Sequence, residues 1–182
     1  MQMINIATHE RERGNHVMNR IIIAALAALI ALPLAATAAT PNTFDALIGH
    51  YEPIRRALLN DTTDGVAAHA SAIARITSEA GKKFSPHAAG VKDADGNECI
   101  DLLGAVGKHA AALANAKDLG AARAAFWALS APMIRYREMA GGDGPAVVYC
   151  SMEKKKWLQP EGEIGNPYTG QKMARCGEIV SK

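Results

Sequence analysis

The sequence predicts a mainly α-helical domain, an antiparallel four-helix bundle with an irregular C-terminal tail of turns and short β segments. Apolar residues recur at three- and four-residue steps in four separate segments between residues 42 and 136. Short or Gly/Pro-bearing connections separate these segments, which is the sequence form of a bundle. After Gly141 this periodicity ends, and Gly and Pro recur through the rest of the chain, as they do where turns dominate.

Residues 1–38 are predicted to be a signal region that is cleaved on export. The apolar run from Ile21 to Leu34 follows Arg20 and leads into Ala36-Thr37-Ala38, an A-x-A-like cleavage pattern. This run of about 14 residues is shorter than the roughly 20 that span a bilayer as a helix, so no permanent membrane span is expected after cleavage. A signal peptide that begins at Met18 would be compact, which leaves open that Met1 is an upstream, mis-assigned start. A periplasmic location follows.

Residues 42–180 are expected to form a single helical-bundle domain, of which residues 146–180 are the motif-bearing tail. The mature chain is long enough for one core and too short for two domains of ordinary size. Its net charge is close to balance, +2 for the whole chain, and basic and acidic residues are interspersed except at Lys154-Lys155-Lys156. Nucleic acid is therefore not expected as a partner.

The helices are predicted from their apolar stripes. The first covers residues 42–60; the second follows the cap-forming cluster Asp61 to Asp64 and could end at Gly81; and the third begins near Glu98 after a long irregular connection over residues 81–97. Asp118 caps the fourth, in which Pro132 predicts a kink, or a break after Ala131.

The tail is predicted to begin with a short strand and a hairpin. Ala146 to Cys150 is a β-like run, and Lys154 to Lys156 form the hairpin tip from which Trp157 and Leu158 return to the core.

Four sulfur donors are concentrated in this tail. Cys150 and Met152 lie in one short segment and Met173 and Cys176 in another. Thiolate and thioether ligands favour Cu(I) over harder cations, so these four residues are the candidate ligands of Cu(I) or Ag(I). The alternative is a Cys150–Cys176 disulfide, which an oxidising compartment favours, with the two methionines as core residues. Either arrangement requires the two cysteines to lie close together.

The remaining candidate residues form no recognisable site. Cys99 is an odd thiol at the start of the third helix, and His50, His69, His87 and His109 show no mutual spacing that indicates one. The sequence contains no G-x-S-x-G, H-E-x-x-H, Walker or C-x-x-C motif, and an enzyme is not expected.

The tail resembles a known family in its motifs. The chain has Tyr149-Cys150-Ser151-Met152, then Trp157-Leu158, then Asn166-Pro167-Tyr168-Thr169-Gly170, then Met173-Ala174-Arg175-Cys176-Gly177. In these motifs and their order, the tail is similar to a domain of unknown function that occurs in exported proteins and in periplasmic adaptor subunits of heavy-metal (copper/silver) RND efflux systems. Ser151 stands where that family usually has Pro. Upstream, Tyr51 and the segment from Phe126 to Ser130 also resemble it.

Two functions are therefore expected from the sequence. The first is a periplasmic protein that binds Cu(I) or Ag(I) for sequestration or for delivery to an adaptor or another component of a metal-efflux system, as the resemblance implies. The second is an envelope interaction module that binds no metal and is stapled by a Cys150–Cys176 disulfide.

Overall fold

Five helices and a small antiparallel sheet make up residues 41–182, the part of the chain that the structure, a computed structural model, describes. The predicted signal region lies outside the described residues. The helices are α2 (Thr43–Leu59), α3 (Val66–Lys82), α4 (Pro86–Ala89), α5 (Gly96–Ala114) and α6 (Leu119–Ala140). The strands are β1 (Ala146–Cys150), β2 (Lys155–Gln159) and β3 (Glu178–Ser181), with single 3₁₀ turns η1 (Asp93–Asp95) and η2 (Gly170–Met173).

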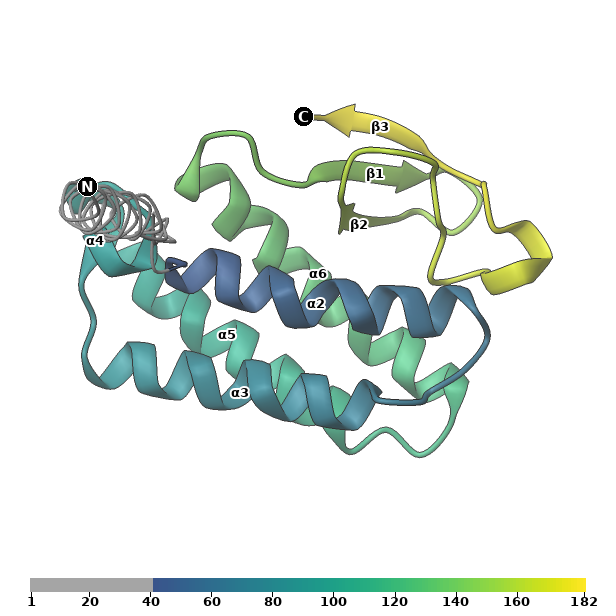
Figure 1. Ribbon diagram of the computed structural model, residues 1–182, viewed down its shortest axis with the longest axis horizontal. Coiled ribbons are helices and arrows are strands. Elements are labelled where there is room, and N and C mark those ends of the chain that lie inside the picture. The colour runs from purple at the N-terminus through teal and green to yellow at the C-terminus, as the bar shows by residue number, and fades with distance from the viewer. Residues whose placement is uncertain (1–40) are drawn as a thin grey trace, which may run out of the picture. The chain divides into compact units, whose positions relative to one another are not determined.

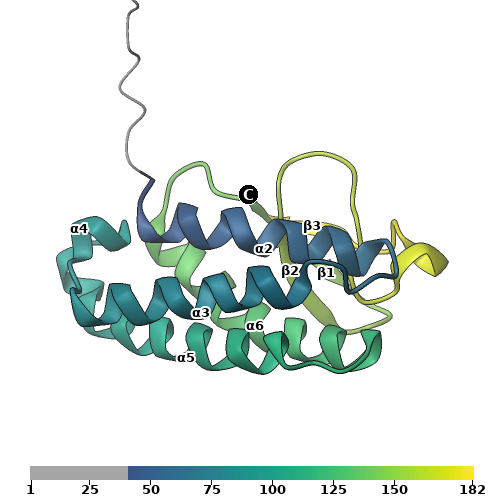
Figure 2. The ribbon, with the colours of Figure 1, turned by 60° about the horizontal axis from the view of Figure 1, so that its bottom comes forward.

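The four long helices bury the predicted apolar stripes against one another. Helix α3 packs against α2 and α5, and α6 packs against α5 and α2 (Figures 1 and 2). The buried side chains are those of the predicted stripes, among them Leu47, Ile54, Ile73, Val106 and Phe126. The mainly helical prediction is confirmed. Within residues 41–182, no helix combines the length and the apolar character that crossing a membrane requires.

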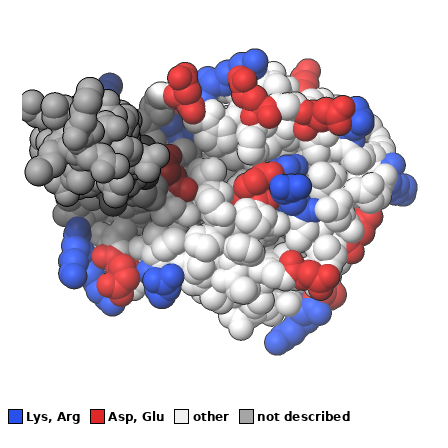
Figure 3. Space-filling view, in the orientation of Figure 1, with Lys and Arg blue, Asp and Glu red and all other residues white. Residues whose placement is uncertain are grey.

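The sheet lies over α2 and α6, on the side away from α3 and α5 (Figures 1 and 2). Its strand order is β2-β1-β3, with both pairs antiparallel. Trp157 and Leu158 are fully buried, so their predicted return to the core is confirmed. The strand prediction for Ala146 to Cys150 is confirmed as well. The predicted position of the hairpin tip is wrong, because the turn covers residues 151–154 and Lys155 and Lys156 already pair with β1. On the face of the molecule shown in Figure 3, charges of both signs are interspersed.

A buried polar cluster fastens the tail to the helices. The Tyr51 hydroxyl on α2 lies 2.6 Å from Ser130 Oγ on α6 and accepts a hydrogen bond from the Leu158 N–H at 3.2 Å. The Tyr168 hydroxyl donates to the Lys156 carbonyl at 2.7 Å. Burial raises the pKa of both phenols, so they remain protonated donors. These bonds fix β2, and with it the β1–β2 turn, relative to α2 and α6.

Three other sequence predictions need correction. The N-cap of α3 is Gly65 and not a residue of the Asp61 to Asp64 cluster, because the Asp61 carboxylate instead accepts hydrogen bonds from Arg123 and from the Gln171 N–H. The predicted break after Ala131 is wrong, because α6 runs without interruption from Leu119 to Ala140 with Pro132 inside it.

The third correction concerns the connection over residues 81–97, which is not wholly irregular. Helix α3 continues through Gly81 to Lys82, and the short helix α4 follows. The Ser85 side chain accepts a hydrogen bond from the Ala88 N–H, Pro86 occupies the first turn, and Gly90 ends the helix in a left-handed conformation. These are ordinary start and stop residues of a helix. Helix α5 then begins at Gly96, two residues before Glu98.

Candidate thiol site

The structure brings together Cys150, at the end of β1, and Cys176, just before β3. Their Sγ atoms lie 2.8 Å apart. Cys150 is buried and Cys176 is partly exposed. The contact follows from the antiparallel pairing of β1 with β3, in which Tyr149 lies opposite Glu178. The end of one strand therefore meets the start of the other, although the cysteines are distant in sequence.

Asn166 organises the loop that delivers Cys176. Its side chain is fully buried; its amide group donates to the Cys176 carbonyl at 2.8 Å, and its oxygen accepts from the backbone N–H groups of Tyr168 at 2.8 Å and Thr169 at 3.2 Å. The Asn166 N–H also donates to the Ala174 carbonyl at 2.7 Å. One side chain thus ties together the two ends of the loop that leads to the second thiol.

Gly177 allows the backbone to pass closely over the core immediately after Cys176. Its φ is +156°, and a Cβ at this position would lie 2.8 Å from the Trp157 ring and 2.9 Å from a Val148 methyl group. Any larger residue would push the chain away from the sheet. The position of Cys176 beside Cys150 therefore depends on a glycine next to it.

The two thiols differ in their affinity for a proton. Burial raises the pKa of Cys150, but a hydrogen bond from Cys176 and bonds from the backbone N–H groups of Glu153 and Met152 outweigh burial, so that the pKa lies below its ordinary value. The pKa of Cys176 is raised by its hydrogen bond to Cys150 and, to a smaller extent, by burial. Cys150 is therefore the thiol of the pair that ionises first, and its thiolate would accept a hydrogen bond from Cys176.

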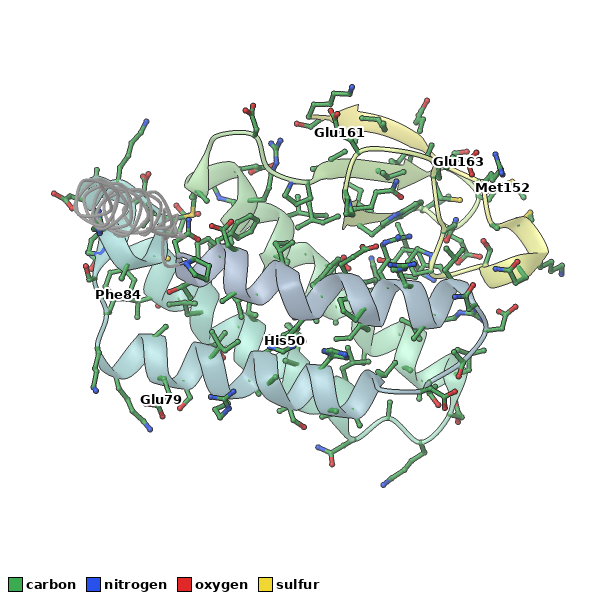
Figure 4. The ribbon with its side chains drawn as sticks, viewed as in Figure 1. His50, Glu79, Phe84, Met152, Glu161 and Glu163 are labelled. Carbon is green, nitrogen blue, oxygen red and sulfur yellow. The ribbon has the colours of Figure 1, made fainter. Side chains whose placement is uncertain are left out.

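The two methionines border the thiol pair in different ways. Met152 lies in the β1–β2 turn, where its N–H is directed at the sulfurs, while its side chain is 69% exposed (Figure 4). Met173 lies in η2, and its carbonyl accepts hydrogen bonds from the Cys176 N–H at 3.0 Å and the Thr169 hydroxyl at 2.9 Å. Neither predicted thioether donor is buried in the core.

Other potential ligands lie away from this pair. In the described part of the chain, His, Cys, Asp and Glu side chains nowhere gather in threes closely enough to hold a metal ion. Cys99, the third thiol, is fully buried in the core at the start of α5, where burial raises its pKa and a hydrogen bond with Tyr136 opposes that effect only in part. Cys99 thus stays protonated and acts as a packing residue.

A pair of histidines was missed by the sequence analysis. His50 on α2 and His69 on α3 lie with their Nδ1 atoms 2.9 Å apart, and both rings are partly buried. Figure 4 shows His50 between the two helices. Burial, then the proximity of His69 and of Arg75, lowers the pKa of His50. The hydrogen bond between the two rings, whose direction depends on their tautomers, links α2 to α3.

We expect this histidine pair to make the protein less stable as the pH falls from 7.5 to 5.5. In the unfolded chain His50 takes up a proton near its ordinary pKa of about 6.5, whereas the folded state holds the pKa lower. The unfolded state therefore binds more protons, and stability is lost below the unfolded pKa. Urea unfolding at both pH values should show a smaller loss for His50→Gln than for the wild type. Equal losses would contradict the assignment.

The matched control is His87→Gln, which replaces an exposed histidine and should leave the pH dependence as it is in the wild type. Carboxylates whose pKa is lowered, such as those of Asp61 and Glu98, lose their contribution to folding stability only at a pH below this interval. They therefore do not contribute to this interval.

The chain was compared with protein families, with curated proteins and with solved structures. Neither protein-family models nor curated proteins nor solved structures gave a match to the chain. The resemblance of the tail to the efflux-associated family stays a prediction.

Proposed function

We propose that this protein binds one soft monovalent ion, Cu(I) or Ag(I), between Cys150 and Cys176. The observation that carries the proposal is the pair of sulfurs 2.8 Å apart, of which Cys150 has a lowered pKa because Cys176 and backbone N–H groups hydrogen-bond to its sulfur. A thiolate is the form in which cysteine binds metals, and N–H groups directed at sulfur are typical outer-sphere partners of metal-bound thiolates.

The donor set favours a soft ion with few ligands. The pair has no third His, Cys, Asp or Glu within the described residues, so zinc in its usual four-coordinate form finds too few ligands here. Two thiolates suit Cu(I), and the exposed thioether of Met152 can supply a further soft donor. An ion held between both sulfurs would separate them by more than the present 2.8 Å, so binding requires Cys176, the partly exposed partner, to move outward.

In this proposal the helices hold the tail that carries the metal ligands. The long helices form an antiparallel four-helix bundle that serves as a rigid base, and the tail carries the ligands Cys150, Met152, Met173 and Cys176. The protein acts in the periplasm after signal cleavage, without catalysis, and sequesters the ion or delivers it to an adaptor or another component of a metal-efflux system.

Anaerobic titration of the reduced, exported protein with Cu(I) against a competing chelator tests the proposal. We expect one equivalent to be retained and two thiols to become protected from thiol reagents. Failure to compete for Cu(I) and for Ag(I) under reducing conditions would contradict it.

The methionines can be tested separately by the double variant Met152→Leu/Met173→Leu. A volume-conserving replacement should change the free energy of unfolding by about 1.5 kcal/mol or less, while the affinity for Cu(I) should fall because the thioether donors are gone. The titration measures the affinity and urea unfolding measures the stability. An affinity equal to that of the wild type would remove both methionines from the site and leave the thiols as its only donors.

A second candidate function is an interaction module stapled by a Cys150–Cys176 disulfide. The observation that favours it is the 2.8 Å separation of the sulfurs, which need approach by less than about 1 Å to reach the bonded distance of roughly 2.05 Å. Thiol counting distinguishes the two candidates: protein that lacks two free thiols as isolated, and that binds no Cu(I) after reduction, would favour the staple.

A further inference from the structure

An open groove lies between α6 and the β1–β2 hairpin. It has a volume of about 340 Å³ and is lined by Trp127, Ala131, Ile134, Tyr149, Lys154 and Lys156. One wall is therefore a face of a helix and the other a strand and its turn. The indole of Trp127 is 50% exposed, the most exposed aromatic side chain of the described residues.

The groove combines an apolar floor with a basic rim. Within residues 41–182, neither Lys154 nor Lys156 makes a salt bridge, whereas Lys155 pairs with Glu153 at 2.9 Å. The ammonium group of Lys155 also lies 5.9 Å from the centre of the Trp127 ring. Positive charge is thus concentrated at one edge of an exposed indole, and the two rim lysines are free to pair with an incoming carboxylate.

The backbone at the rim is held in an unfavourable conformation. Lys154 has φ = +53°, in the left-handed region that Gly and Asn adopt most readily. A lysine in this region is strained, and such outliers cluster at sites of function. This conformation belongs to the turn that brings Lys154 to the groove together with Lys156 from β2.

We propose that this groove docks an acidic segment of a partner protein, with one aromatic or large aliphatic side chain inserted against Trp127. The volume suits a single anchoring side chain, and anchors of this kind provide most of the affinity of many interfaces. Asp or Glu residues on either side of the anchor pair with Lys154 and Lys156, which gives the orientation. The groove goes beyond metal binding and would exist whether or not the thiols hold an ion. A docked partner lies next to the turn that follows Cys150.

Titration of the exported protein with short peptides tests the proposal. The probe is acetyl-Glu-Asp-Phe-Glu-Glu-amide, compared with the same peptide carrying Ala in place of Phe and with a peptide carrying Lys in place of each acidic residue. We expect saturable binding of the first peptide alone. Lys154→Gln/Lys156→Gln should weaken it by about tenfold, since rim charges steer and orient a partner. Trp127→Ala should weaken it at least as much because it removes the apolar floor.

The matched control is Lys108→Gln/Lys117→Gln, which removes the same charge from exposed positions elsewhere and should leave binding unchanged. Circular dichroism of each variant confirms that it is folded. The proposal is overturned if the control pair weakens binding as much as the rim pair, or if no peptide binds. It is also overturned if vesicles of equal parts phosphatidylglycerol and phosphatidylcholine bind through Trp127 while the acidic peptide does not, because the groove would then face a membrane.

Discussion

Replacing Asn166 with alanine is expected to lower the free energy of unfolding by about 3 kcal/mol and to separate the two thiols. The Asn166 side chain is fully buried and bonds to the backbone of Tyr168, Thr169 and Cys176. Alanine leaves one buried and two partly buried backbone groups without their partner, at a cost of about 1 kcal/mol for each. The loop then no longer holds Cys176 against Cys150. Urea unfolding measures the first effect, and the spectroscopic pKa of Cys150 measures the second.

Two further variants make this prediction specific. Asn115→Ala removes a single exposed hydrogen bond, to the Ala111 carbonyl at 2.8 Å, and should cost less than about 1 kcal/mol. Asn166→Asp keeps the acceptor oxygen but loses the donor and places a negative charge near Cys150. A nearby like charge disfavours the thiolate, so the pKa of Cys150 should rise. If Asn166→Ala were no more destabilising than Asn115→Ala, Asn166 would not organise the loop.

The helical part of the fold was largely predictable because each long helix buries one regular apolar stripe. Such a stripe is a local property of the sequence, and Leu47, Ile73, Val106 and Phe126 are all buried as expected. The errors arose where tertiary contacts outweigh local preference. Asp61 is a good capping residue by type, but Arg123 and Gln171 use its carboxylate. Helix α6 continues through Pro132, with Ser130 and Met133 buried before and after it in the helix.

The candidate site was predictable in its main residues and not in its details. Turn residues between the two sulfur-bearing segments indicated that the chain reverses, and Cys150 and Cys176 do meet. The protonation asymmetry of the pair depends on N–H groups of the β1–β2 turn, whose direction no residue type discloses. The same holds for His50 and His69, because their contact depends on how α2 and α3 are aligned.

The motifs that carry the family resemblance include residues with structural roles. Tyr168 hydrogen-bonds to β2, Asn166 closes the loop, and Gly177 lets the chain pass close to Trp157. Gly170 has φ = +57°, and a side chain there would overlap Asp61 and Arg123. These residues would be needed to hold a thiol pair whatever the pair does. The motif therefore indicates the shape of the tail more directly than it indicates a metal, and the cysteines need a test of their own.

Replacing Cys150 with serine is expected to reduce the affinity for Cu(I) by more than the roughly 10- to 100-fold that loss of an outer-sphere partner costs. Serine removes the thiol of the pair with the lower pKa, and its oxygen is a poor ligand for a soft ion. The pKa of Cys176, which the Cys150 sulfur raises, should at the same time fall toward its ordinary value. Chelator competition measures the affinity, and the ultraviolet absorbance of the thiolate measures the pKa.

The partner variant and a matched control decide between a two-thiol site and a single reactive cysteine. Cys176→Ser should lose Cu(I) affinity as Cys150→Ser does, because each leaves one sulfur where two are needed. Cys99→Ala removes a thiol that is buried in the core beside Tyr136, so it should retain wild-type affinity at some cost in stability. If Cys150→Ser binds Cu(I) as tightly as Cys99→Ala does, the ion is held elsewhere, and the thiol pair is left with the role of a disulfide staple.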